Sequence, residues 1–171
     1  MSNASDQDVA RMVAQLTERV EELESIRALE RLRTEFHRCL NNAEWEALGA
    51  LFADDALLDY GEFGQAHGSA GVTDFYSALP KKILEFQRGA SEINFKNFIQ
   101  GHQVELTGKD SAKGVSFFEE KIRFDRASEI HHSTGQFTDT YVRRDGRWYF
   151  AGVELDHYWV VPNNDDWRWP W

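Results

Sequence analysis

The stretch GQFTDTYVRRDGRWYFAG, residues 135–152, decides the fold of this chain. Apolar and polar residues alternate on both sides of Asp145 and Gly146, which is typical of strands with one buried face. An Asp-Gly pair between two such runs is a strong signal for a tight hairpin turn. We therefore predict two antiparallel strands, residues 131–143 and 147–160, joined at this pair.

Two more strands precede this hairpin, and helices precede the strands. Residues 97–107 and 114–125 have strand-like patterns, and turn-forming stretches, LTGKD and DRAS, follow them. Residues 7–41 contain neither Pro nor Gly and are rich in Ala, Leu, Glu, Arg and Gln, which predicts one long helix. Helices followed by an antiparallel meander predict an α+β domain with helices on one face of a curved sheet.

Between the long helix and the meander the pattern is less regular. The stretch NNAEWEALGALFADDA predicts a turn and a short helix. The stretch LLDYG predicts a short strand that ends at Gly61, and a helical region over 71–86, interrupted by Pro80, follows it. We expect one face of the short helix to be buried through Trp45, Leu48, Leu51 and Phe52.

The long helix carries two apolar stripes. Its second half has a stripe that faces a core. Its first half has a four-three spacing that suits a short coiled-coil seam, but two heptads are too few to be stable alone. We therefore expect residues 1–24 to form an arm that packs on its own body or on a second subunit, beside a domain of residues 25–160 and an aromatic tail of 161–171. The seam residues are Val9, Val13, Leu16, Val20 and Leu23, and the core stripe is Ile26, Leu29, Leu32, Phe36 and Leu40.

Composition narrows the classes of function. Hydrophobic residues make up 42% of the 171 residues, so the chain is globular and of single-domain size. The net charge of −10 argues against nucleic acid or an anionic membrane as a partner. Cys39 is the only cysteine, so no internal disulfide can form. No basic segment followed by an apolar one opens the chain, and we expect a cytoplasmic protein.

The order of these elements resembles the SnoaL-like branch of the NTF2-like superfamily. The resemblance covers residues 25–160 and rests on WEALGALFADDA after a long helix and on the pattern T-D-x-Y-x-R-x-D-G-x-W near the end. It implies a strongly bent, mixed or antiparallel sheet that forms a cone with its helices around an apolar cavity. The superfamily includes scytalone dehydratase, polyketide cyclases and a dehydrochlorinase, and also non-catalytic subunits, so the fold does not determine the reaction.

Two asparagines stand where the resemblance implies catalytic residues. Elimination enzymes of this branch typically pair an Asp late in the first long helix with a His at the start of the first long meander strand. These positions fall at Asn41 and Asn97. An amide cannot take up a proton at neutral pH, so this base cannot operate here. Two alternatives stay open: the cavity is a binding or structural site, or its acid and base have moved.

Histidines are the first candidates for a relocated acid or base. His37 lies one helical turn before Asn41 and shares its face, although a hydrogen-bonded structural role is equally open. His131 and His132 are adjacent on a strand, so only one of them can enter the cavity. We favour His131, with a solvated loop residue as the alternative. The resemblance places three residues of matching parity on the cavity side: Ser133, Gly135 and Phe137.

A carboxylate and a phenol are the other candidates. Glu120 is expected to face inward between Phe118 and Ile122, where a carboxylate is costly unless paired or used, but a shift of one residue would place Glu119 inside instead. Tyr60 falls where family members put a cavity aromatic or phenol, which can polarise a substrate oxygen, and core packing is its alternative role. Leu58, on the same predicted strand, is expected to line the cavity.

The sequence and the resemblance together predict a cofactor-independent lyase or isomerase for a small hydrophobic, phenolic molecule. The implied reaction is dehydration or a related elimination, such as loss of formaldehyde (deformylation) from an aryl-propane diol. His131, His37 or Glu120 would move the proton, while Tyr60 and the asparagine pair would hold the oxygen. The alternative is a non-catalytic module that binds a ligand or a partner subunit.

Cofactors and partners follow from the same patterns. No His-x-x-x-His or His-x-Glu spacing supplies metal ligands from one element, and no Gly-rich phosphate loop is present, so we expect neither metal nor cofactor. A homodimer or homotrimer is expected, because aromatic residues near the end favour packing against another subunit. These residues are Trp159, Trp167, Trp169 and Trp171.

Overall fold

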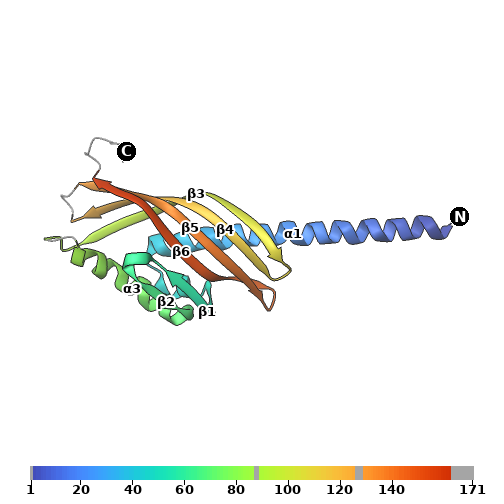
Figure 1. Ribbon diagram of the computed structural model, residues 1–171, viewed down its shortest axis with the longest axis horizontal. Helices are drawn as coiled ribbons and strands as arrows, with labels where there is room; N and C mark the ends of the chain where they lie inside the picture. Colours follow the sequence, from blue (N-terminus) through green and yellow to red (C-terminus); the bar gives the residue numbers. More distant parts are fainter. Residues whose placement is uncertain (1, 87–88, 126–128, 163–171) are drawn as a thin grey trace.

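The computed structural model describes residues 2–86, 89–125 and 129–162, and Figure 1 shows their arrangement. The last three tail tryptophans lie outside the described residues. The helices are α1 (Ser2–Asn42), α2 (Trp45–Gly49), the 3-10 helix η1 (Gly61–Phe63) and α3 (Gly68–Phe86). The strands are β1 (Phe52–Asp59), β2 (Gln65–His67), β3 (Ile93–Gly108), β4 (Ser111–Phe124), β5 (Ile130–Arg144) and β6 (Arg147–Pro162).

The strands form one mixed sheet in the order β2-β1-β6-β5-β4-β3. Strands β3 to β6 are the predicted antiparallel meander, and β1 joins β6 in parallel. Asp145 and Gly146 form the two-residue β5–β6 turn, and both have positive φ angles, of 50° and 78°. A tight hairpin of this type requires this conformation at both positions, so the hairpin prediction is confirmed.

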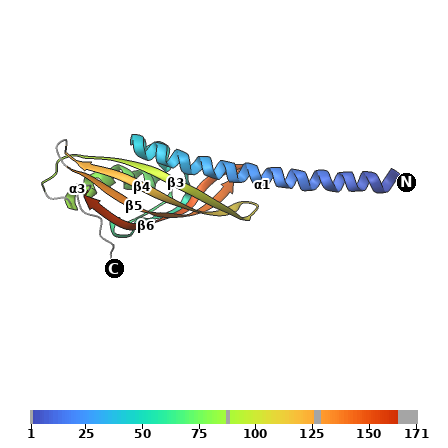
Figure 2. The same ribbon diagram turned by 90° about the horizontal axis from the view of Figure 1, so that it is seen from above.

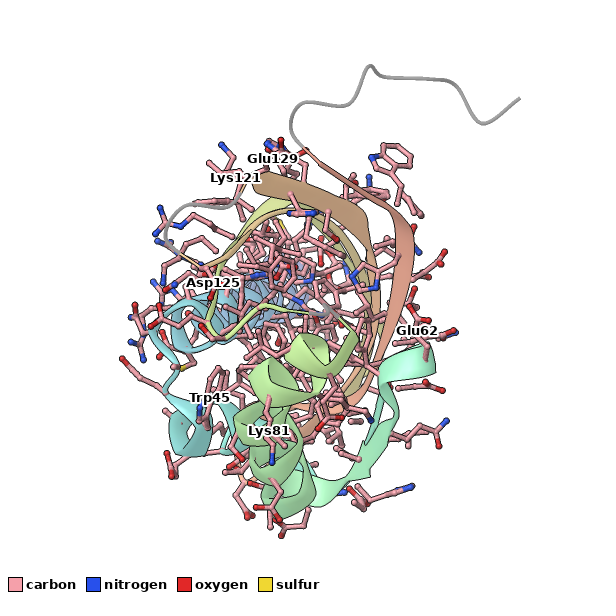
Figure 3. The ribbon with its side chains drawn as sticks, turned by 90° about the vertical axis from the view of Figure 1, so that its left-hand side faces the viewer. Trp45, Glu62, Lys81, Lys121, Asp125 and Glu129 are labelled. Atoms are coloured by element: carbon pink, nitrogen blue, oxygen red, sulfur yellow. The ribbon has the colours of Figure 1, made fainter. Side chains whose placement is uncertain are left out.

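The sheet is strongly curved, and helices cover its concave side. Seen from the end in Figure 3, the meander bends around the second half of α1, and α3 closes the open side. The core fills this space and is unusually aromatic. The fully or nearly fully buried rings of the core include Phe36, Phe52, Tyr76, Phe137 and Phe150. The predicted α+β architecture is confirmed.

The short elements differ from the sequence predictions. The short helix ends at Gly49, and Phe52 instead begins β1, where it pairs with Phe150 of β6. Hydrogen bonding to two neighbouring strands thus outweighs the helical spacing of the apolar residues in this stretch. Strand β1 ends at Asp59, before Gly61. Helix α3 continues through Pro80, with Tyr76 and Leu79 buried before the proline and the partly buried Ile83 packed against the core after it.

A fully buried ion pair, which the sequence analysis missed, connects α1 to the sheet. Arg33 Nε donates to Asp139 Oδ2 at 2.9 Å, and a second guanidinium nitrogen donates to Oδ1. The Tyr141 hydroxyl also donates to Asp139 Oδ2, at 2.7 Å. The guanidinium lies 4.5 to 4.9 Å from the centres of three aromatic rings, which favours a cation at this position. These rings are Phe36, Phe137 and Phe150.

His102 belongs to the same buried network. Its Nε2 lies 2.9 Å from the Tyr141 hydroxyl. Strand β3 has a bulge at Gly101, which adopts a φ of 69° and has no Cα partner on β4. The extra residue reverses the side-chain alternation and turns His102 inward.

The first half of α1 extends beyond the sheet as a continuous helical arm (Figures 1 and 2). The five seam residues, Val9 to Leu23, are 51% to 64% exposed. The described helices include none whose length and apolar character would let it span a membrane.

Candidate active site

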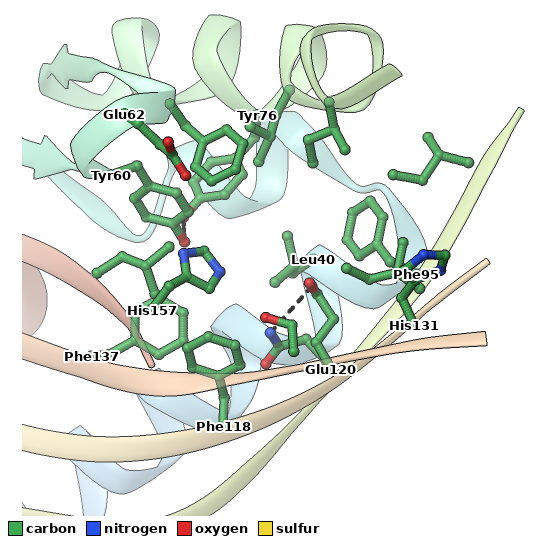
Figure 4. Close-up of a pocket in the computed structure, with 18 of the residues that line it drawn as sticks. Leu40, Tyr60, Glu62, Tyr76, Phe95, Phe118, Glu120, His131, Phe137 and His157 are labelled. Carbon is green, nitrogen blue, oxygen red and sulfur yellow. Dashed lines mark hydrogen bonds between the residues drawn. The ribbon is translucent and has the colours of Figure 1, made fainter. Parts of the chain in front are cut away.

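The concave face of the sheet, the end of α1 and helix α3 enclose a cavity of about 290 Å³ (Figure 4). This volume lies at the small end of the range for ligand sites. Most of the wall is aliphatic or aromatic, so a ligand that fits must be largely apolar. The apolar lining is Leu40, Phe63, Leu79, Ile83, Ile93, Phe95, Phe118, Ile122, Phe124, Phe137 and Leu155.

Three polar residues form one row across the floor of this cavity. Asn97 of β3 pairs in register with Glu120 of β4, and Glu120 pairs with Ser133 of β5. Paired residues on neighbouring strands point to the same side of a sheet, and all three line the cavity. Asn97 Oδ1 and Ser133 Oγ have no hydrogen-bond partner among the described residues. A ligand with polar groups at one end would meet free acceptors and donors here.

Glu120 is the ionisable centre of the row. Its carboxylate accepts one hydrogen bond, at 3.3 Å, from Asn97 Nδ2, and most of the cavity wall is apolar. Burial disfavours the charged form and raises the pKa of Glu120 to about 7, although the bond from Asn97 opposes this rise. Glu120, and not Glu119, is the carboxylate that faces the cavity, because Glu119 points outward and its side chain is 39% exposed. A carboxyl with this pKa can both accept and return a proton near neutral pH.

The asparagine pair has a structural role that the sequence analysis did not predict. Asn41 does not line the cavity, which corrects its expected role in holding substrate. Its Nδ2 donates to the carbonyl of Asn97, and its Oδ1 accepts from the N–H of Asn97, both at 2.7 Å. This two-point contact satisfies the backbone of β3, which is an edge strand, and fixes the end of α1 to it. The Asn97 side chain remains free to reach Glu120.

The adjacent histidines lie on opposite faces of β5, as strand alternation requires. His131 lines the cavity, stacks edge-on against Phe124 with ring centres 5.4 Å apart, and keeps its buried Nδ1 without a partner among the described residues. His132 lies on the outer face, 3.6 Å from a carboxylate oxygen of Glu119. Of these two histidines, only His131 can therefore contact a ligand in the cavity.

His37 lies behind the cavity wall and does not line it, contrary to expectation. Its ring packs between Phe36 and Phe137, with ring centres 5.3 and 5.8 Å away. Burial and, to a smaller extent, the positive charge of Arg33 lower the pKa of His37 to about 3. The Asn97 amide opposes this fall, yet neither ring nitrogen reaches good hydrogen-bond geometry within the described part of the chain. His37 is thus a neutral core residue at physiological pH.

Two tyrosine hydroxyls meet at the wall opposite the polar row. Tyr76 of α3 donates to the hydroxyl of Tyr60, and both residues line the cavity. Burial raises the pKa of both phenols above the ordinary value, so both keep their protons. The Tyr60 hydroxyl accepts from Tyr76 and is left with its own proton to donate. The sequence analysis identified Tyr60 but not Tyr76, because helix spacing alone does not show which turn faces the cavity.

The remaining expected residues divide between cavity and core. Phe118 and Phe137 line the cavity and contact each other, with ring centres 5.0 Å apart. Leu58 is fully buried and pairs with Val153 of β6, and neither of these residues lines the cavity. His157 of β6 lines the cavity and packs edge-on against Phe118. Burial lowers the pKa of His157, although Glu62 and Asp156 oppose this effect.

The site combines an apolar enclosure with a few converging polar groups. Among the described residues, no three His, Cys, Asp or Glu side chains cluster as metal ligands would. The groups that can act chemically are a carboxyl with a raised pKa, a phenol with a free proton, and the cavity-facing imidazoles of His131 and His157. This arrangement suits acid–base chemistry on an apolar molecule.

A bent sheet and helices that enclose such a cavity define the NTF2-like class of proteins. The sequence profile of the SnoaL-like domain matches residues 21–154, and the chain belongs to this family.

Several solved structures are similar to this chain in fold. LinA-type3, a hexachlorocyclohexane dehydrochlorinase from Novosphingobium barchaimii LL02, has 18% identity and a TM-score of 0.72 over 88% of this chain and 98% of its own. A scytalone dehydratase-like protein from Novosphingobium aromaticivorans DSM 12444 has 20% identity and a TM-score of 0.67 over 85% and 92%. ActVI-ORFA from Streptomyces coelicolor has 14% identity and a TM-score of 0.62 over 79% and 98%. At these identities the likeness shows the shared fold.

Proposed function

We propose that the protein is a cofactor-independent lyase or isomerase that acts on a small hydrophobic, phenolic molecule, with Glu120 as its general base. The observation that carries this proposal is the Glu120 carboxyl, whose pKa of about 7 is matched to proton transfer at neutral pH and which faces an apolar cavity. The dehydrochlorinase and the dehydratase-like protein of the same fold support an elimination.

The cost of desolvating Glu120 supports a catalytic role over a structural one. No cation contacts this carboxyl among the described residues, and its one hydrogen bond comes from a neutral amide. The protein thus maintains an acidic group in an unfavourable place with little compensation. Such groups are common in active sites, where a perturbed pKa serves the reaction.

The proposed reaction removes a proton and a neighbouring group from the substrate. In a dehydration, Glu120 takes a proton from one carbon, the C–H electron pair becomes the new double bond, and the C–O bond of the adjacent carbon breaks. His131 donates a proton to the departing oxygen, which leaves as water. In a deformylation, the substrate first loses its benzylic hydroxyl and its phenolic proton as water, which gives a quinone methide. Glu120 then takes the proton of the terminal hydroxyl, and the C–C bond breaks to release formaldehyde. The electron pair of that bond becomes the new double bond and turns the quinone methide into a phenolate, which takes up a proton.

The opposite wall orients the substrate. The Tyr60 hydroxyl, which Tyr76 fixes by donating to it, supplies a hydrogen bond to a substrate oxygen. The polar row of Asn97, Glu120 and Ser133 then faces the reacting carbons. Phe118 and Phe137 exclude water from the reacting groups and pack on an aromatic ring of the substrate.

A second candidate function is a non-catalytic module that binds a hydrophobic ligand. The two hydrogen bonds between the Asn41 side chain and the Asn97 backbone favour it. At the position of the family's usual acid–base pair, these bonds fix the end of α1 to β3 and have a structural role.

The two candidates differ in turnover. We would incubate the purified protein with a chelator, no added cofactor, and a panel of phenolic alcohols and diols, and follow loss of water or formaldehyde by mass spectrometry. Glu120→Gln should slow product formation by about 10²-fold or more, while Glu119→Gln, the same chemical change on the outer face of β4, should preserve its rate. Binding without product across the panel would contradict the lyase proposal and favour the ligand-binding module.

A further inference from the structure

The exposed seam of α1 is an apolar feature that the cavity does not explain. Its five residues, Val9, Val13, Leu16, Val20 and Leu23, form one stripe along the arm, and each is more than half exposed. Exposure of this extent on a soluble helix indicates a surface that another chain covers.

The seam cannot be an extension of the face that packs on the body. The residues that bury the second half of α1, such as Leu29 and Phe36, lie more than about 100° around the helix from the seam, at 100° per residue. Because α1 is one continuous helix, the arm cannot turn back onto its own sheet. Arg27 and Glu30 occupy the next two seam positions and are exposed, so the apolar seam ends where the body begins.

The identity of the seam residues indicates how many helices it joins. In heptad terms, Val13 and Val20 are a positions, whereas Val9, Leu16 and Leu23 are d positions, so leucine occupies both d positions that lie beside a β-branched a position on each side of Val20. β-Branched residues at a with leucine at d favour a parallel two-stranded coiled coil.

The flanking charges indicate the relative direction of the helices. Arg19 is a g position and Glu24 is the e position of the following heptad. In a parallel pair, g of one helix meets the following e of the other, so Arg19 and Glu24 would form two opposite-charge contacts. In an antiparallel pair centred on the seam, Arg19 would face Arg19 of the other helix. Within its own helix, Arg19 has only a long 3.8 Å contact, with Glu22.

We propose that residues 9–24 form a parallel two-stranded coiled coil with a second copy of this chain. The two sheets, with the helices that cover them, then lie on the outer sides of the coil, because each sheet packs on a face of α1 that points away from the seam. This pairing joins two complete cavities into one assembly, since no seam residue lines the cavity.

Site-directed disulfide formation in the full chain tests the pairing directly. In a Cys39→Ala background, Val13→Cys places a thiol at the same height on both helices of a parallel pair, and Glu18→Cys places it on the outward face as a matched control. Disulfides require Cα atoms within about 7 Å, so Cys at 13 should crosslink at least about tenfold faster than Cys at 18. Leu16→Glu, which places a charge in the seam, should reduce the rate at 13 to that of the control.

The charge pair tests the direction independently. Added to Val13→Cys, either Arg19→Glu or Glu24→Arg alone should slow crosslinking, since each places like charges together. A mixture of the two variants should restore it, because both contacts are then of opposite charge. Equal rates at 13 and 18, or no rescue in the mixture, would overturn the proposal. So would crosslinking of the Cys at 13 only to a Leu23→Cys chain, which indicates antiparallel helices.

Discussion

Replacing Glu120 by Gln should make the protein more stable at alkaline pH. The folded protein holds a proton on Glu120 up to a pKa of about 7, whereas the ordinary value is 4.5. Between these values the folded state binds more protons than the unfolded state, so stability falls as pH rises through this window. The contribution is fully present below 4.5 and lost above 7. At 1.36 kcal/mol for each pH unit, the loss is about 3 kcal/mol.

Glu120→Gln removes this titration while keeping the size of the side chain and its ability to accept from Asn97. The variant should therefore gain about 3 kcal/mol relative to the wild type between pH 4.5 and pH 8.5, or about 6–12 °C in Tm for a chain of this size. Urea unfolding at a series of pH values measures it, with Glu119→Gln as the control. A difference between wild type and Glu120→Gln that stays flat across this range would refute the claim that Glu120 is desolvated.

Three further predictions test other parts of the structure. Asp139→Asn leaves the buried Arg33 without its counter-ion and should cost about 3–5 kcal/mol in unfolding free energy, and adding Arg33→Met should recover most of the loss. Tyr60→Phe removes the free phenolic donor and should lower kcat about 10²-fold with a smaller change in KM. His131→Ala should lower turnover by about 10²-fold or more with little loss of ligand binding, while His132→Ala should not, and equal effects of the two would contradict the assigned faces.

Local patterns predicted the meander well. The Asp-Gly turn defines the β5–β6 hairpin, and once that register is known, strand alternation determines that His131 faces the cavity and His132 does not. The same alternation left Glu119 and Glu120 undecided, because it gives two possible registers with no local signal to choose between them. Only the pairing of Glu120 with Asn97 and Ser133 in the sheet removes this ambiguity.

Features that depend on distant contacts were not predictable from one sequence. Arg33 and Asp139 are 106 residues apart, and nothing near either residue indicates that they form a buried pair. The bulge at Gly101 reverses the direction of His102, and a single glycine in a strand does not by itself predict which of the following side chains turn inward. Asn41 was expected in the cavity because the resemblance places a catalytic Asp at this position, whereas the backbone of an edge strand takes up both of its side-chain hydrogen-bonding atoms.

The pH dependence of kcat/KM, measured for the wild type and Glu120→Gln on a substrate from the phenolic panel, tests the central claim most directly. For the wild type we predict a rate that rises with pH through about 7, as Glu120 loses its proton and becomes a base. Glu120→Gln should be slower by about 10²-fold or more and should lack this rise. A variant that keeps both the rate and the profile of the wild type would show that Glu120 is not the base.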